Sequence, residues 1–99
     1  MHASTSRKHR CMKTRFTKRG TADYHHWRDN NAKLFERVRT FILAIHVDPF
    51  NGIGKPERLR HHKNPALYSR RIDREHRLVY SMENGELPII ACRYHYEDL

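Results

Sequence analysis

Turn signals divide the last third of the chain into three short segments in which apolar and polar side chains alternate. This alternation predicts β-strands over roughly 67–72, 76–82 and 87–96. The second turn contains Asn84-Gly85, a dipeptide that strongly favours a tight hairpin. Strands joined by such short turns pair in antiparallel fashion, so this part of the chain is expected to form an antiparallel sheet.

Upstream of the sheet, the apolar residues recur with the period of a helix. We expect a short strand near 13–17, a helix over 21–27, and a longer helix from a cap at Asn30 to about Val47. The longer helix has one apolar face, made by Leu34, Val38, Phe41, Ile42 and Ile45. The sequence therefore predicts an α+β fold in which two N-terminal helices pack on one face of a small antiparallel β-sheet.

The segment between the long helix and the sheet is rich in residues that interrupt regular structure. Residues 49–67 contain three of the four prolines and two of the four glycines. We expect a long loop here, anchored by the apolar side chains of Phe50, Ile53 and Leu59. A long loop inside a compact domain is often functional.

The chain is strongly basic, with 20 Lys and Arg against 11 Asp and Glu and a formal charge of +9. This balance predicts a polyanionic partner, with nucleic acid ahead of an acidic protein or an anionic membrane. No apolar run is long enough to cross a membrane, and two cysteines are too few for a disulfide framework. We therefore expect a protein of the reducing cytoplasm that does not bind membranes.

The length of 99 residues suits one domain, which we expect over residues 12–99. Residues 1–11 are expected to be a disordered basic extension. The basic residues up to Arg19 are equally compatible with a solvated tail and with an arm that reaches phosphates. The nine histidines lack the spacing of metal ligands, so no metal site is expected.

Strand alternation also sorts the side chains between the two faces of the sheet. If the more apolar sets face the helices, Ile90 and Cys92 lie on the helix side, and Ile89 and Ala91 lie on the other side. The same assignment collects four cationic or titratable side chains on the uncovered face: Arg71, Arg77, Arg93 and His95. They are either solvated surface residues or a surface that binds phosphates.

Cleavage of RNA through the 2′-hydroxyl requires three kinds of group. A base removes the proton of that hydroxyl, cations stabilise the charge on the phosphate, and an acid protonates the leaving 5′-oxygen. Glu57, the arginines of the uncovered face and His95 would supply all three.

Four motifs of the chain resemble the YoeB/Txe toxins of the RelE/ParE superfamily in order and spacing. They are Pro-Phe-Asn-Gly-Ile-Gly-Lys-Pro-Glu at 49–57, Ser-Arg-Arg-Ile at 69–72, Glu-His-Arg-Leu-Val-Tyr at 75–80 and Ala-Cys-Arg-Tyr-His-Tyr at 91–96. Asp23, Tyr24 and Trp27 also match, so the resemblance covers about residues 12–96. It implies a microbial-ribonuclease-like fold and a toxin of a type II toxin–antitoxin module.

The resemblance also implies an activity, which is ribosome-dependent cleavage of mRNA without a metal or an organic cofactor. Glu57 corresponds to the general base, His95 to the general acid, and Arg77 to the residue that stabilises the transition state. Arg60 falls where the family commonly has a lysine that contacts the substrate, Arg71 would assist Arg77, and Tyr96 would help shape the site. Arg93 is expected to bind RNA phosphates because alternation places it on the uncovered face.

Several partners follow from the resemblance: mRNA in the ribosomal A site, ribosomal RNA, and an antitoxin of the YefM or Axe kind. A homodimer is left open. Two other functions remain as alternatives, namely a basic module that binds RNA or the ribosome without cutting it, and a ParE-like inhibitor of gyrase. The combination of Glu57, Arg77 and His95 favours the nuclease, because a pure binding protein needs no carboxylate within a cationic site.

Overall fold

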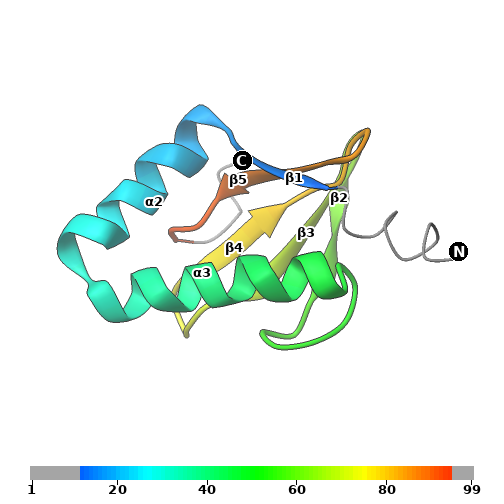
Figure 1. The fold of residues 1–99 in the computed structure, drawn as a ribbon. Helices are drawn as coiled ribbons and strands as arrows, with labels where there is room; N and C mark the ends of the chain where they lie inside the picture. Colours follow the sequence, from blue (N-terminus) through cyan, green and yellow to red (C-terminus); the bar gives the residue numbers. More distant parts are fainter. Residues whose placement is uncertain (1–11, 95–99) are drawn as a thin grey trace, which may run out of the picture.

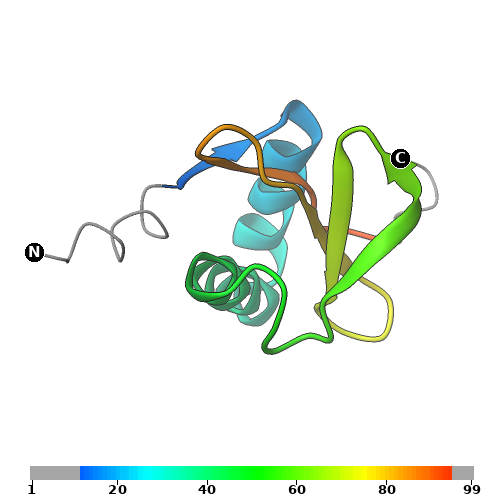
Figure 2. The same cartoon turned by 90° about the vertical axis from the view of Figure 1, so that its right-hand side faces the viewer.

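A computed structural model describes residues 12–94, which contain two helices and five strands (Figure 1). In chain order these are β1 (Lys13–Phe16), α2 (Lys18–Asn30), α3 (Ala32–Val47), β2 (Glu57–Lys63), β3 (Ala66–Arg71), β4 (Arg77–Tyr80) and β5 (Glu86–Ala91). The strands form one sheet in the order β1-β5-β4-β3-β2, and both helices cover the same face of it (Figures 1 and 2). The predicted α+β architecture is confirmed.

The sheet is antiparallel from β2 through β5, but β1 joins β5 in parallel. The register runs from the pair Lys13 and Glu86 to the pair Phe16 and Ile89. The sheet is therefore mostly antiparallel, and the parallel pairing of β1 is a feature that the sequence did not predict. Local turns determine how β3, β4 and β5 pair, whereas β1 meets β5 only after both helices and the other strands have intervened.

Both helices begin at a side-chain cap. Thr17 Oγ1 accepts a hydrogen bond from the N–H of Gly20 at 3.0 Å, and α2 begins three residues earlier than predicted. The second helix is capped by Asn31, whose Oδ1 accepts from the N–H of Leu34 at 3.1 Å. Asn30, the predicted cap, instead ends α2. Of the two adjacent asparagines, Asn31 has the extended backbone that a cap requires.

The main core lies between the helices and the sheet. Val38, Phe41, Ile42 and Ile45 of α3 are all buried in it, and Leu34 packs against its margin, so the predicted apolar face is confirmed. Each such side chain contributes about 1.5–3 kcal/mol when it leaves water. No helix within residues 12–94 is long and apolar enough to cross a membrane.

A bulge in β5 changes which side chains face the helices. Val79 pairs with Ala91, but the next residue of β4, Tyr80, pairs with Ile89, so Ile90 is an extra residue. Ile89 consequently lies in the main core, and Ile90 packs against the cluster on the opposite face. The strict alternation predicted for this strand is wrong at both residues, because a bulge shifts the alternation by one position.

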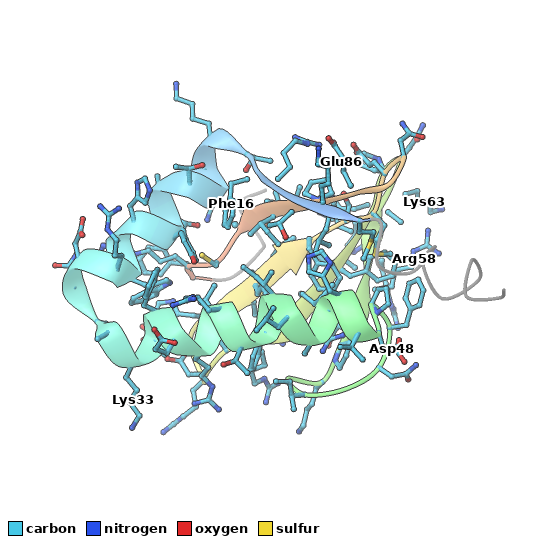
Figure 3. The ribbon with its side chains drawn as sticks, in the orientation of Figure 1. Phe16, Lys33, Asp48, Arg58, Lys63 and Glu86 are labelled. Carbon is cyan, nitrogen blue, oxygen red and sulfur yellow. The ribbon has the colours of Figure 1, made fainter. Side chains whose placement is uncertain are left out.

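The predicted long loop is shorter than expected, because residues 57–63 form the edge strand β2. This strand is mostly charged, and Leu59 is its one buried residue, so its sequence lacks a strand pattern. Arg58 and Lys63 lie along it at the rim of the molecule (Figure 3). Figure 2 shows the β2–β3 hairpin at the end of the sheet that is furthest from β1.

Candidate active site

A buried arginine holds the loop that leads from α3 to β2. Arg70 lies on β3, and its side chain is fully buried on the helix side of the sheet. Its guanidinium donates to three main-chain carbonyls of the loop, those of Asp48 at 2.5 Å, Asn51 at 3.0 Å and Ile53 at 3.1 Å. Three charge-assisted hydrogen bonds from one planar group fix the course of the loop.

Tyr80 supports the same loop from the neighbouring strand β4. Its hydroxyl donates to the carbonyl of Pro49 at 2.6 Å and accepts from Arg70 Nε at 3.3 Å. Burial raises the pKa of Tyr80, and the nearby Arg70 partly offsets that effect. The hydroxyl therefore keeps its proton and remains a donor to the loop.

The loop also stabilises its own turn next to the end of α3. Asp48 Oδ1 accepts from the N–H groups of Phe50 and Asn51, at 3.0 and 3.2 Å, and these hydrogen bonds lower the pKa of the carboxyl. Further along, the N–H of Arg71 donates to the carbonyl of Gly54 at 2.6 Å. The loop is thus attached to β3 at both ends, and Glu57 follows as the first residue of β2.

The strand register brings Glu57 to Arg77 on the uncovered face. Glu57 is paired with Ser69 across β2 and β3, and Arg71 is paired with Arg77 across β3 and β4. Glu57 Oε1 lies 3.7 Å from Arg77 Nη1, and the same nitrogen donates to Ser69 Oγ at 3.1 Å. The Arg77 side chain is 15% exposed and that of Glu57 is 51% exposed. The site therefore combines a held guanidinium with a carboxylate that a substrate hydroxyl can reach.

Below this pair, the uncovered face carries a small apolar cluster, made by Leu59, Leu67, Val79 and Ala91. One buried residue comes from each of the strands β2 to β5, so the cluster ties the edge strand to the rest of the sheet. Alternation correctly places Val79 and Ala91 on this face. The cluster supports the strands from which Glu57 and Arg77 project.

The other predicted site residues are distributed around this pair. Arg71 is exposed beside Arg77, and Arg60 is exposed on the edge strand β2. Arg93 follows β5 in a bend, where its guanidinium lies 4.7 Å from the ring centroid of Tyr94 and donates to the hydroxyl of that residue at 3.0 Å. Since Arg93 is not in a strand, the alternation argument that placed it on the open face does not apply.

Two predicted residues, His95 and Tyr96, lie outside the described residues 12–94, as does the extension over residues 1–11. Their roles remain predictions. The sequence did not predict that Ser69 would hold the guanidinium of Arg77 or that Arg70 would hold the loop before Glu57. An arginine at a core position of a strand was a signal for a buried hydrogen-bonding role, whereas the contact between Ser69 and Arg77 had no signal. Within residues 12–94, no three His, Cys, Asp or Glu side chains are grouped as metal ligands would be.

Comparisons with known proteins agree on one family. Residues 16–96 match the family model described as a YoeB-like toxin of bacterial type II toxin-antitoxin systems. Toxin YoeB of Synechocystis sp. is 46% identical over 86 residues, which are 87% of this chain and 99% of that protein. Toxin YoeB of Streptomyces coelicolor is 44% identical over 85 residues, which are 86% of this chain and all of that protein.

Solved structures of such toxins share the fold. A YoeB/ParE toxin from Agrobacterium tumefaciens has a TM-score of 0.78 at 38% identity, over 86% of this chain and 100% of that chain. YoeB from Staphylococcus aureus was solved as a dimer and in a heterotetrameric complex with YefM, with TM-scores of 0.77 and 0.75. Each is 34% identical, over 86% of this chain and 98% of the other. The fold is the microbial-ribonuclease-like fold of YoeB and RelE toxins.

Proposed function

The chain belongs to the YoeB-like toxins of bacterial type II toxin–antitoxin systems, and we propose that it is a ribosome-dependent endoribonuclease that cuts mRNA. The observation that carries this proposal is the pairing of Glu57 with Arg77, 3.7 Å apart on the uncovered face. A half-exposed carboxylate beside a mostly buried guanidinium is suited to proton abstraction next to a phosphate. A surface that only bound RNA would gain nothing from that carboxylate.

In the proposed reaction, Glu57 takes the proton of the ribose 2′-hydroxyl, and the resulting oxygen attacks the adjacent phosphorus. Arg77, with Arg71 beside it on the next strand, stabilises the extra negative charge that develops on the phosphate oxygens. His95 protonates the 5′-oxygen as its bond to phosphorus breaks. The products are a 2′,3′-cyclic phosphate and a 5′-hydroxyl, and the reaction uses neither a metal ion nor an organic cofactor.

Other residues serve the substrate without exchanging protons. Ser69 accepts a hydrogen bond from Arg77 and so limits the positions that the guanidinium can take. Arg60 and Arg93 are proposed to contact RNA phosphates, and Tyr96 to help shape the site. Arg60 is well placed for such a contact because it is exposed on the edge strand β2.

The proposed setting is the bacterial cytoplasm, where the substrate is mRNA in the ribosomal A site. The formal charge of +9 favours binding to ribosomal RNA and to an acidic antitoxin segment of the YefM or Axe kind. The Staphylococcus aureus relatives, solved with YefM and as a dimer, support the antitoxin and a homodimer as partners. Residues 12–99 are proposed to form the toxin domain, preceded by a basic extension.

Mapping of new 5′ ends on programmed ribosomes tests this proposal. We expect the wild-type chain to produce new 5′ ends within the A-site codon. Glu57→Gln and His95→Ala should lower the cleavage rate by about 10²–10⁴-fold each, the range for loss of a general acid or base. A matched control is Glu36→Gln, which breaks an exposed ion pair with Arg39 on α3 and should leave cleavage unchanged.

Three results would contradict the proposal. A wild-type chain that stalls translation without new 5′ ends would be a non-cleaving ribosome-binding module. A chain that leaves mRNA intact but blocks DNA supercoiling by gyrase would belong with the ParE-like inhibitors in function. Equal loss of activity in Glu57→Gln and Glu36→Gln would mean that the carboxylate of Glu57 has no specific role.

A further inference from the structure

The main chain just after β5 is held by side chains of α2. At Cys92, the N–H donates to Asp23 Oδ2 at 3.0 Å, and the carbonyl accepts from Trp27 Nε1 at 2.8 Å. Arg19 Nη2 donates to the carbonyl of Arg93 at 3.4 Å. Asp23 and Trp27 are themselves buried, so these contacts come from well-packed side chains. The strand ends at Ala91, yet α2 continues to fix the course of the chain beyond it.

At Tyr94 the main chain is held instead by two consecutive residues, His76 just before β4 and Arg77 at its start. The N–H of Tyr94 donates to His76 Nδ1 at 2.7 Å, and the carbonyl of Tyr94 accepts from the N–H of Arg77 at 3.1 Å. Tyr94 has a φ of +65°, a conformation that residues other than glycine rarely adopt. Such strain persists only where the surroundings enforce it, and it is frequent at functional sites.

His76 is built into the core rather than placed on the surface. Its side chain is 10% exposed, and its ring packs edge-on against Trp27 with 4.8 Å between centroids. Because Nδ1 accepts the N–H of Tyr94, the lone pair of that nitrogen faces the main chain and the proton of a neutral ring lies on Nε2. No apolar side chain could replace this contact, although several could fill the same space.

We propose that His76 is a positioning residue for the cleavage reaction. By accepting the N–H of Tyr94, it holds the main chain of Tyr94 beside Arg77, and His95 is the next residue in the sequence. This inference rests on the proposed function, because its purpose is to direct the general acid. Arg77 then acts twice, since its guanidinium pairs with Glu57 and its N–H holds the carbonyl of Tyr94.

Two substitutions separate positioning from packing. His76→Phe keeps a ring against Trp27 but removes the acceptor, whereas His76→Asn offers Oδ1 close to the place of Nδ1. A misplacement of about 1 Å can cost about 10²-fold in rate. We therefore expect His76→Phe to lower the single-turnover cleavage rate by about 10–100-fold, while the affinity for the ribosome stays unchanged. His76→Asn should retain cleavage within about 5-fold of the wild type, as a partial replacement for the lost acceptor.

The experiment uses the full chain on programmed ribosomes, with cleavage and ribosome binding measured separately. Amide hydrogen exchange at Tyr94 provides a second measurement, and it should be faster in His76→Phe than in His76→Asn. Cleavage by His76→Phe at the wild-type rate would overturn the inference. An equal fall in the cleavage rate of His76→Phe and His76→Asn would also overturn it. A fall that weaker ribosome binding or unfolding explains entirely would have the same consequence. A wild-type chain that cuts no mRNA would overturn the proposed function, and the inference with it.

Discussion

Substitution of Gly54 by alanine tests how closely the loop before Glu57 is packed, and Gly85 offers a matched control. Both glycines have a positive φ, +83° at Gly54 and +79° at Gly85, so an alanine meets nearly the same backbone penalty at each. They differ in their surroundings. A Cβ at Gly54 would lie 2.6 Å from Phe41 Cε2 and 3.0 Å from Arg70 Cβ, whereas a Cβ at Gly85 would meet nothing within 4 Å.

The two costs can be estimated separately. The left-handed conformation costs an alanine about 1–2 kcal/mol, and this applies at both positions. Overpacking against the core adds about 1–3 kcal/mol, and it applies at Gly54 alone because Phe41 and the Arg70 Cβ lie in fixed parts of the fold. We expect Gly54→Ala to lower the free energy of unfolding by about 2–5 kcal/mol and Gly85→Ala by about 1–2 kcal/mol.

Urea denaturation of both variants provides the measurement. At a slope of about 1–3 kcal/mol per molar urea, the extra loss of about 1–3 kcal/mol in Gly54→Ala should separate the two midpoints by about 0.3 M or more. The cleavage rate should fall in Gly54→Ala alone, since the carbonyl of Gly54 holds the loop to Arg71 three residues before Glu57. Equal losses of stability in the two variants would refute the reasoning, because they would show that the loop has room for a methyl group.

Three further predictions concern other contacts. Arg70→Met leaves three loop carbonyls without their donor, and each unsatisfied carbonyl costs about 1–3 kcal/mol. Urea denaturation should therefore show that the free energy of unfolding falls by about 3 kcal/mol or more. A fall of less than about 1 kcal/mol would mean that water replaces the guanidinium. Thr17→Ala removes the cap of α2 and should cost about 1 kcal/mol, seen as a lower Tm; an unchanged Tm would contradict a role for the cap. Burial, reinforced by Asp23, raises the pKa of Cys92 from 9.0 to about 12, so the folded chain keeps a proton that the unfolded chain releases. The stability that this thiol contributes is complete below pH 9, and it should fall by up to about 1.4 kcal/mol per pH unit as the pH rises from 9 to 12. The free energy of unfolding, measured with urea across that pH range, should fall less steeply with pH in Cys92→Ala than in the wild type. The same pH dependence in both proteins would exclude this cause.

The candidate site was only partly accessible from the sequence. The motifs predicted that Glu57, from the loop side, must reach Arg77 on the sheet, and the structure places them 3.7 Å apart. The residues that hold this pair were not predicted. The contact of Ser69 with Arg77 had no signal in the sequence, and the core position of Arg70 indicated a buried hydrogen-bonding role without showing which groups it would bind. His76 is a similar case, since its buried Nδ1 has meaning only once the main chain of Tyr94 is beside it.

Local patterns in the sequence were enough to determine the long helix and the sheet strands after it. The apolar face of α3 and the Asn84-Gly85 hairpin act over a few residues, and their physical causes, helical period and turn conformation, are present in any short segment. The fold class followed from them. The exact caps did not, because Asn30 and Asn31 are equivalent as side chains and differ only in backbone conformation.

Only the tertiary structure decided how distant segments meet. The parallel pairing of β1 with β5, the edge strand β2 and the bulge at Ile90 all depend on hydrogen bonds between segments whose own sequences do not require them. A strand such as β2, with Leu59 as its buried residue, exists because β3 offers it a partner. Burial of Arg70 likewise depends on the loop that folds over it. The sequence by itself therefore determined most of the helices and strands and predicted the chemistry of the site, and packing between remote segments decided how Glu57 and Arg77 meet.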